Sequence, residues 1–163
     1  MFGNCWSLTS IVVNSGNTVY RSEGNCLIQI ADNALIAGCS ASVIPNGVIS
    51  INDLAFYGCL SLTNITIPNS VMSIGAGAFY DSISLTGITI PDSVTSIGDN
   101  AFYGCSSLIT VTFEGANTEF NSIYTFPGVN SYSGSMLQAY QLGGIGTYNR
   151  QGSNSYTWTW TKE

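Results

Sequence analysis

Acid–base or nucleophilic chemistry in this sequence would depend mainly on carboxylates and thiols, because the 163 residues include no histidine. A Ser-His or Cys-His pair is therefore excluded. Four aspartates, Asp53, Asp81, Asp92 and Asp99, lie in turn-like contexts near glycine or serine, where aspartate commonly bonds to the backbone. Their spacing selects no carboxylate pair of the glycosidase kind. The sequence predicts no enzyme, no catalytic or metal-ligating residues and no cofactor.

The thiols belong to five cysteines: Cys5, Cys26, Cys39, Cys59 and Cys105. An odd number without a Cys-x-x-Cys spacing argues against zinc and against a disulfide framework. Cys5, Cys59 and Cys105 occupy the same place in a repeated unit, and Ser82 takes that place in the unit between the last two. A place that accepts cysteine or serine is typical of a small buried residue, so we expect these three thiols to be buried and free. The spacing leaves a Cys26–Cys39 disulfide open.

An internal repeat of 23 residues determines the elements that position these side chains. The segment 67–71 (IPNSV) returns as 90–94 (IPDSV), and 78–80 (AFY) returns as 101–103. Self-similarity at such a period is typical of solenoids, in which each coil buries its apolar face against its neighbours. Within one unit, Leu62, Ile65 and Ile67 are spaced as inward-facing residues, and Val71 and Ile74 form a second inward segment.

The repeat indicates one domain, residues 1–163, with four parts. These are a partial first coil (1–13), a hairpin insert (14–42), regular coils (43–113) and a C-terminal cap (114–163). In the insert, segments 26–30 and 34–37 flank a loop at 31–33 and predict a β-hairpin that projects from the coil edge. In the cap, 135–142 is the one plausible helix, and 156–161 alternates aromatic residues with threonine, which predicts a covering strand that carries Trp158 and Trp160.

Charge limits the possible partners. Only 7% of the residues are charged, the net charge is −6, and Arg21, Arg150 and Lys162 are the only cations. Binding to nucleic acid or to an anionic membrane depends on clustered lysine and arginine, so both partners are excluded. No apolar run approaches the roughly 20 residues that a membrane helix needs. Residues 1–13 lack a basic n-region and a cleavage site, so we expect no signal peptide within this chain.

Two surfaces are candidates for recognition. The first is the outward face of the coils, where threonine and tyrosine columns recur at the repeat period, and the second is the hairpin insert around Arg21. Packing alone offers a simpler explanation, because exposed strands favour threonine and half-buried tyrosines fill space. The candidate binding residues are Thr66, Thr89, Thr112, Asn64, Tyr57, Tyr80, Tyr103 and Arg21.

The chain begins within a repeat unit, since Phe2, Leu8, Ile11 and Val13 align with apolar residues of the later coils. No polar unit precedes them, although solenoid ends usually need one. These four residues are therefore a candidate self-association edge.

The repeated units, Ile-Pro-Asn-Ser-Val-x-Ser-Ile-Gly, Ala-Phe-Tyr-Gly-Cys and Ser-Leu-Thr-x-Ile-Thr-Ile, resemble the BspA-like (23-residue, Treponema-type) leucine-rich repeats of bacterial surface proteins. The resemblance covers 2–13 and 43–113, and Ser70 and Ser93 take the place of the usual Asn/Cys after the strand. It implies a leucine-rich-repeat solenoid, a β-rich right-handed coil with short strands and little helix. It also implies an extracellular or cell-surface module that binds proteins in adhesion. No family motif assigns contact residues.

Three functional hypotheses follow. The leading one is a non-enzymatic adhesion or protein-binding scaffold at the cell surface or outside the cell. The first alternative is a self-assembling, fibre-forming structural subunit that binds copies of itself through the N-terminal edge. The second is a carbohydrate-binding module that stacks a glycan on Trp158, Trp160 or the tyrosine column.

Overall fold

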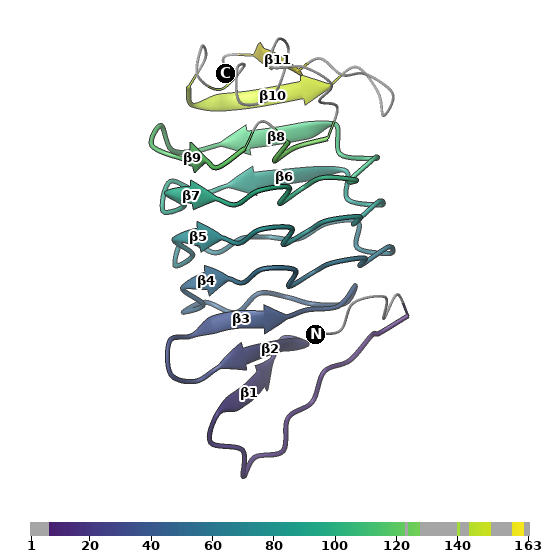
Figure 1. Ribbon diagram of the computed structural model, residues 1–163, viewed down its shortest axis with the longest axis vertical. Helices are drawn as coiled ribbons and strands as arrows, with labels where there is room; N and C mark the ends of the chain where they lie inside the picture. The colour runs from purple at the N-terminus through teal and green to yellow at the C-terminus, as the bar shows by residue number, and fades with distance from the viewer. Residues whose placement is uncertain (1–6, 123, 128–139, 141–143, 151–157, 162–163) are drawn as a thin grey trace.

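The computed structural model describes residues 7–122, 124–127, 140, 144–150 and 158–161. These residues form an elongated β-solenoid of stacked coils, with β1 at one end and β10 and β11 at the other (Figure 1). The only helical residue among them is Tyr140. The predicted leucine-rich-repeat solenoid with short strands and little helix is therefore confirmed.

The described residues contain eleven strands, which lie in two sheets. The larger sheet contains, in spatial order, β1 (Tyr20–Glu23), β2 (Cys26–Gln29), β3 (Ala34–Ala37), β4 (Ser50–Ile51), β5 (Ser73–Ile74), β7 (Ser96–Ile97) and β9 (Glu119–Phe120). The smaller sheet contains β6 (Gly87–Ile90), β8 (Thr110–Phe113), β10 (Gly146–Arg150) and β11 (Trp158–Thr161), in the order β6-β8-β10-β11.

The repeat period sets the strand register. Ser50 pairs with Ser73 and Ser73 with Ser96 in parallel, each 23 residues further on. In the smaller sheet, Ile88 pairs with Val111 at the same interval. Successive coils therefore pair in register, through β4, β5 and β7 in the larger sheet and through β6 and β8 in the smaller one, and equivalent side chains stack above one another.

A column of phenylalanine rings runs through the core. Phe56, Phe79, Phe102 and Phe126 are all buried, and successive ring centroids are 4.9, 5.1 and 4.8 Å apart. The rings are nearly parallel, with interplanar angles of 3°, 4° and 9°. The repeat predicts the first three rings. Phe126 continues the column after the sequence repeat has decayed.

The inward positions of each coil are confirmed. Leu62 and Ile67, together with Val71 and Ile74, belong to one hydrophobic cluster, and Ile65 packs against that cluster while partly exposed. Segment 64–67 forms no strand, yet its buried Ile67 still follows an exposed Thr66, so side chains alternate there as they do in β6.

The small position that accepts cysteine or serine is also buried. The side chains of Cys59, Ser82 and Cys105 donate to the carbonyls of Gly38, Phe56 and Phe79, respectively, each in the preceding rung. The position therefore needs a small side chain with a donor, which explains why cysteine and serine alternate there. Cys26 and Cys39 are buried free thiols as well, and Cys5 lies outside the described residues.

The hairpin between 26–30 and 34–37 is confirmed as the antiparallel pair β2–β3. The sequence suggested that this hairpin projects from the coil edge, but in the structure it does not. β3 pairs in parallel with β4, and Cys26, Ile28 and Leu35 lie in the core. The apolar runs of both strands are long enough to be buried on two faces, so the hairpin becomes the first rung of the stack.

Residues 7–13 do not form the expected preceding rung. They contain no strand, and Leu8, Ile11 and Val13 are only partly buried. The place beside β4 is already taken by β3. The Val13 amide instead donates to Ser22 Oγ at 2.8 Å, which holds this segment beside β1. Phe2 lies outside the described residues.

The C-terminal cap is confirmed for its described part. β10 joins the smaller sheet antiparallel to β8, and β11 pairs with β10. Tyr148 and Trp158 are buried against the last coil. The expected helix at 135–142 lies outside the described residues except for Tyr140, whose buried hydroxyl donates to the Gly115 carbonyl at 2.8 Å.

Candidate functional site

A shallow groove of about 550 Å³ lies on the outward face of the smaller sheet. Its lining residues come from three successive coils: Asn64, Ile65, Thr66, Ile67, Asn69, Gly87, Ile88, Thr89, Thr110, Thr112 and Glu114. The structure therefore brings together four of the predicted binding residues, Asn64, Thr66, Thr89 and Thr112.

Strand pairing aligns these residues into two columns. Thr89 stands opposite Thr112, and Gly87 opposite Thr110. Asn64 and Thr66 are exposed at the equivalent positions of the preceding coil, and Thr89 is exposed as well. Because the sheet behind them is buried, this end of the groove presents hydroxyl and amide groups on a rigid support.

The columns continue onto β10, which the sequence did not reveal. Thr147 pairs with Thr112, and their hydroxyl oxygens are 3.0 Å apart. Asn149 pairs with Thr110, whose hydroxyl donates to Asn149 Oδ1 at 3.1 Å. β10 lies outside the repeat and runs antiparallel to β8, so no periodicity indicates its register. These bonds occupy the C-terminal end of the columns and leave the end at Asn64 and Thr66 more open.

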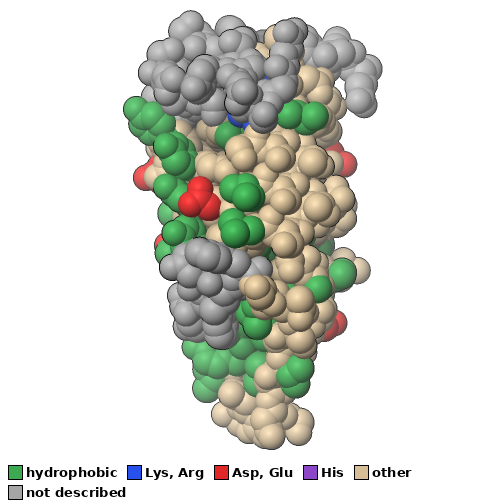
Figure 2. All heavy atoms as spheres, turned by 90° about the vertical axis from the view of Figure 1, so that its right-hand side faces the viewer, with side chains coloured by type: hydrophobic (Ala, Val, Ile, Leu, Met, Phe, Trp, Pro, Cys, Tyr) green, Lys and Arg blue, Asp and Glu red, His purple; other side chains and the backbone are tan. Residues whose placement is uncertain are grey.

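The groove is nearly neutral. Of the described residues that line it, Glu114 alone is charged. On the face that Figure 2 shows, most of the described surface is likewise uncharged polar side chain or backbone, with separate acidic side chains. Such a surface can donate and accept hydrogen bonds, but it offers no activated nucleophile and no strong long-range field.

The tyrosine column is a separate feature. The ring centroids of Tyr57, Tyr80 and Tyr103 are 5.6 and 5.2 Å apart, with tilted planes. Tyr103 is 44% exposed. None of the three lines the threonine groove, so the predicted threonine and tyrosine residues do not form one site.

Arg21 lies on β1 at the N-terminal end of the stack. Its guanidinium forms an ion pair with Glu23 and donates to Asn33 Oδ1 at 3.3 Å. The positive charge of Arg21 is therefore balanced by Glu23 on the same strand. This strand lies at the opposite end of the stack from β10 and β11 (Figure 1).

Trp158 is not available as a stacking platform, because it is only 4% exposed. Its indole N–H donates to the Pro127 carbonyl at 3.1 Å, and the Arg150 guanidinium carbon lies 5.7 Å from the ring centroid. Burial lowers the pKa of Arg150, whose guanidinium donates to the Ser106 carbonyl. This cluster closes the last coil. Trp160 also belongs to β11.

The buried thiols are poorly suited to nucleophilic chemistry. Desolvation raises the pKa of Cys59 and of Cys105 to about 12 and that of Cys26 to about 11. Thiolate, the reactive form, is therefore scarce at neutral pH. In the described part of the chain, no group of three potential metal ligands occurs. The same residues include no helix long and apolar enough to cross a membrane.

The stacked rungs, the inward apolar pattern and the 23-residue register agree with a known repeat class. The model of the BspA type leucine rich repeat region matches residues 29–136, in six copies. The chain belongs to this family. The match begins in β2 and includes β3, in keeping with the position of β3 as the first rung, and it excludes residues 2–13, where the sequence also suggested a coil.

Two solved structures resemble this BspA-type chain. A leucine-rich repeat protein from Eubacterium ventriosum ATCC 27560 is 29% identical with a TM-score of 0.64, and the match covers 74% of this chain and 33% of that one. A leucine rich cell surface protein from Faecalibacterium prausnitzii A2-165 is 27% identical with a TM-score of 0.41, over 70% of this chain and 44% of that one. This chain thus spans between a third and a half of their lengths. Comparison with curated proteins gives no match.

Proposed function

We propose that this BspA-type chain is a non-enzymatic protein-binding scaffold that acts in adhesion at the cell surface or outside the cell. The observation that carries the proposal is the threonine groove, in which three successive coils present hydroxyl and amide groups in register. The family assignment supports a role in protein interaction.

The groove suits a partner segment with polar side chains or exposed backbone. Thr66 and Thr89 are solvent-exposed, so hydrogen bonds to a partner would replace bonds to water without breaking internal ones. The residues that alternate with the groove threonines, Ile67, Ile88 and Val111, are buried in the core, which holds the surface rigid and lowers the ordering cost of binding. With Glu114 as its only charge, the groove would select partners by shape and hydrogen bonding more than by charge.

A binding screen with groove variants tests the proposal. The chain would be immobilised and exposed to a panel of extracellular-matrix and cell-surface proteins, and saturable binding would be measured by surface plasmon resonance. We expect Thr89→Lys to weaken the captured interaction at least tenfold, because it places a long charged chain in the groove. Thr95→Lys is the matched control, since Thr95 is also exposed but lies outside the groove. Absence of saturable binding, or equal effects of both variants, would contradict the proposal.

Self-assembly is a second candidate, favoured by the terminal position of β1 in the larger sheet. β1 is the outermost strand of that sheet, and Val12 and Val19 beside it are 84% and 53% exposed. An unpaired edge strand can pair with another chain. Multi-angle light scattering across a wide concentration range should then reveal association that Val12→Asp and Val19→Asp abolish. A monodisperse monomer at high concentration would eliminate this candidate.

A carbohydrate-binding role would depend on aromatic side chains that a sugar ring can reach. Trp158 is buried, so among the described residues the tyrosine column is the surface on which a glycan could stack.

A further inference from the structure

A second pocket, of about 470 Å³, lies between the first rung and the first regular coil, away from the threonine groove. Its ends are fixed by two backbone bonds, from the Asn52 amide to the Leu35 carbonyl at 2.9 Å and from the Gly38 amide to the Ala55 carbonyl at 2.8 Å. Between these bonds the chain is extended in β3 but turns at residues 52–55, where the Ala55 amide donates to the Asn52 carbonyl at 3.2 Å. The backbones of β3 and of residues 52–55 therefore diverge between the two bonds, and the pocket occupies the space between them.

In the later coils, turn stacks on turn at this place. The Leu54 amide donates to the Ala76 carbonyl, and the Gly77 amide donates to the Asp99 carbonyl. Only the turn at 52–55 has a straight strand, β3, on its N-terminal side. The pocket is therefore a consequence of the hairpin that begins the stack.

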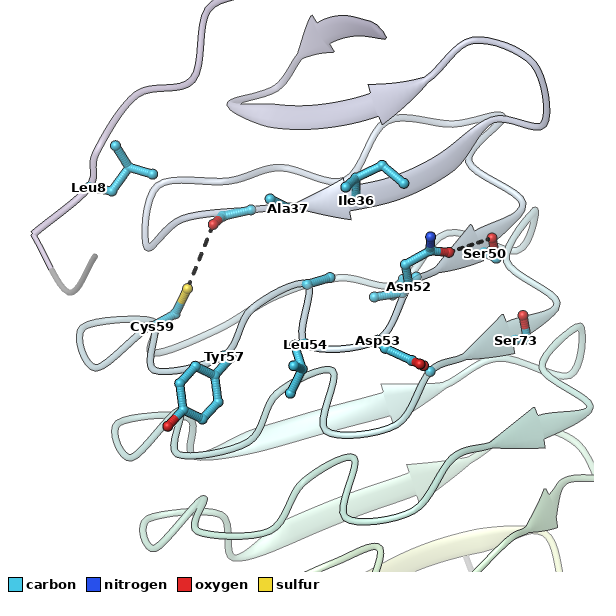
Figure 3. Close-up of a pocket in the computed structure, with 14 residues that line it drawn as sticks. Leu8, Ile36, Ala37, Ser50, Asn52, Asp53, Leu54, Tyr57, Cys59 and Ser73 are labelled. Atoms are coloured by element: carbon cyan, nitrogen blue, oxygen red, sulfur yellow. Dashed lines mark hydrogen bonds between the residues drawn. The ribbon is translucent and has the colours of Figure 1, made fainter. Parts of the chain in front are cut away.

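The pocket has an apolar end and a polar end. Leu8 and Tyr57 lie toward one end, and Ser50, Asp53 and Ser73 lie toward the other (Figure 3). Asp53 is the only charged residue among the described residues of the lining. Its Oδ1 accepts from the Ala76 amide at 2.7 Å, so Oδ2 can accept from a ligand.

Among the described residues, Asp53 has no cationic partner. Arg21 pairs with Glu23, and Arg150 is buried in the C-terminal cap. Within the described part of the chain, this exposed carboxylate therefore lies next to an apolar surface without a counter-ion. A cation on an aliphatic stem complements such an environment.

Leu54, which also lines the pocket, has an unusual backbone conformation. Five non-glycine residues in the described chain have positive φ; four are Asn or Asp, and the fifth is Leu54 at +59°. The equivalent positions of the next two coils hold Gly77 and Asn100. A leucine is strained there, and its side chain remains 52% exposed. The leucine side chain lies over Gly77, where Cδ2 would be 2.8 Å from an added Cβ, and it supplies an apolar wall to the pocket.

We propose that this pocket binds an amphipathic cation, in the form of a lysine or arginine side chain from a partner segment. The ammonium or guanidinium group bonds to Asp53, and the aliphatic stem lies along Leu54 and Tyr57. The described lining of this pocket shares no residue with that of the threonine groove. A negative result for one site therefore leaves the proposal for the other intact.

Titration of the isotope-labelled full chain tests the site by nuclear magnetic resonance. The probes are Nα-acetyl-lysine methylamide and Nα-acetyl-arginine methylamide, and Nα-acetyl-norleucine methylamide supplies the aliphatic stem without charge. We expect saturable shifts of the amides at 52–55 and 75–76 with the two cations, at millimolar concentration, and weaker shifts with norleucine. Thr89, in the groove, should not respond.

Two variants separate the charge from the apolar wall. Asp53→Asn keeps an acceptor for the Ala76 amide and should weaken the cationic probes about 1.5-fold to fivefold, the range for an accessible ion pair. Asp99→Asn is the matched control, because Asp99 holds the same position two coils later and lies outside the pocket. Leu54→Asn should weaken all three probes. Equal responses to lysine and norleucine, equal effects of Asp53→Asn and Asp99→Asn, or no saturable shift at 52–55 would each overturn the proposal. Thermal unfolding midpoints would verify that every variant is folded.

Discussion

Removal of one ring from the phenylalanine column should destabilise the solenoid strongly. Phe79 is fully buried between Phe56 at 4.9 Å and Phe102 at 5.1 Å, with both neighbours nearly parallel to it. Phe79→Ala removes the ring and leaves a cavity that two adjacent coils line. Each coil of a solenoid contacts mainly its neighbours, so the loss affects two interfaces at once.

The expected loss is about 3–5 kcal/mol, the usual range for a buried phenylalanine replaced by alanine. This loss combines the loss of apolar volume with the loss of ring stacking. Phe79→Leu separates these two contributions, because it keeps most of the apolar volume but loses both stacked contacts. At about 0.5–1.5 kcal/mol for each aromatic pair, this variant should lose about 1–3 kcal/mol. Whole domains are stable by only about 5–15 kcal/mol, so Phe79→Ala approaches the limit of folding.

Urea unfolding followed by circular dichroism, under reducing conditions, measures these losses. Ile83→Ala is the control for an apolar truncation, since Ile83 is 41% exposed and should cost less than about 1 kcal/mol. A loss for Phe79→Ala no larger than that of Ile83→Ala would refute the conclusion that the ring column holds the coils together.

Three further predictions concern the small positions between coils. Cys105→Ser should cost less than about 1.5 kcal/mol, whereas Cys105→Val, which lacks the donor to the Phe79 carbonyl, should cost about 1–3 kcal/mol in the same urea assay. Burial holds the pKa of Cys59 and Cys105 at about 12, above the ordinary 9.0, so the unfolded state releases these protons first. Their contribution to the free energy of unfolding should be complete below pH 9 and decline as pH rises toward 12. Unfolding curves at a series of pH values would compare wild type with a Cys59→Ala/Cys105→Ala variant. The absence of a decline in wild type relative to that variant would contradict this prediction. Gly98→Ala should destabilise the chain by about 1–3 kcal/mol, because a Cβ there would lie 2.5 Å from the Ala76 amide nitrogen, while Gly87→Ala, with its nearest neighbour at 3.6 Å, should differ little from wild type.

Much of the regular region could be predicted from the sequence. The 23-residue period predicts the parallel register of Ser73 with Ser96, the burial of Leu62 and the stacking of Phe56, Phe79 and Phe102. It also places Thr66, Thr89 and Thr112 in one column before any coordinates are known. These features depend on short-range alternation and on copies of one unit, and both are visible in the sequence.

The ends of the stack were harder to predict, because segments without a repeat partner can pair in several ways. The sequence indicates the β2–β3 hairpin but not its parallel pairing with β4. It likewise indicates an aromatic strand at Trp158 but not which face of the strand is buried.

The sequence by itself determined the solenoid, its period and the direction of each side chain within a coil. Only the tertiary structure decided that β3 is the first rung, that Thr147 and Asn149 extend the threonine groove, and that a pocket forms beside Asp53. The reason is physical. Stacking of identical coils follows from local pattern, whereas each of these three features depends on contact between a repeated segment and a segment that does not repeat.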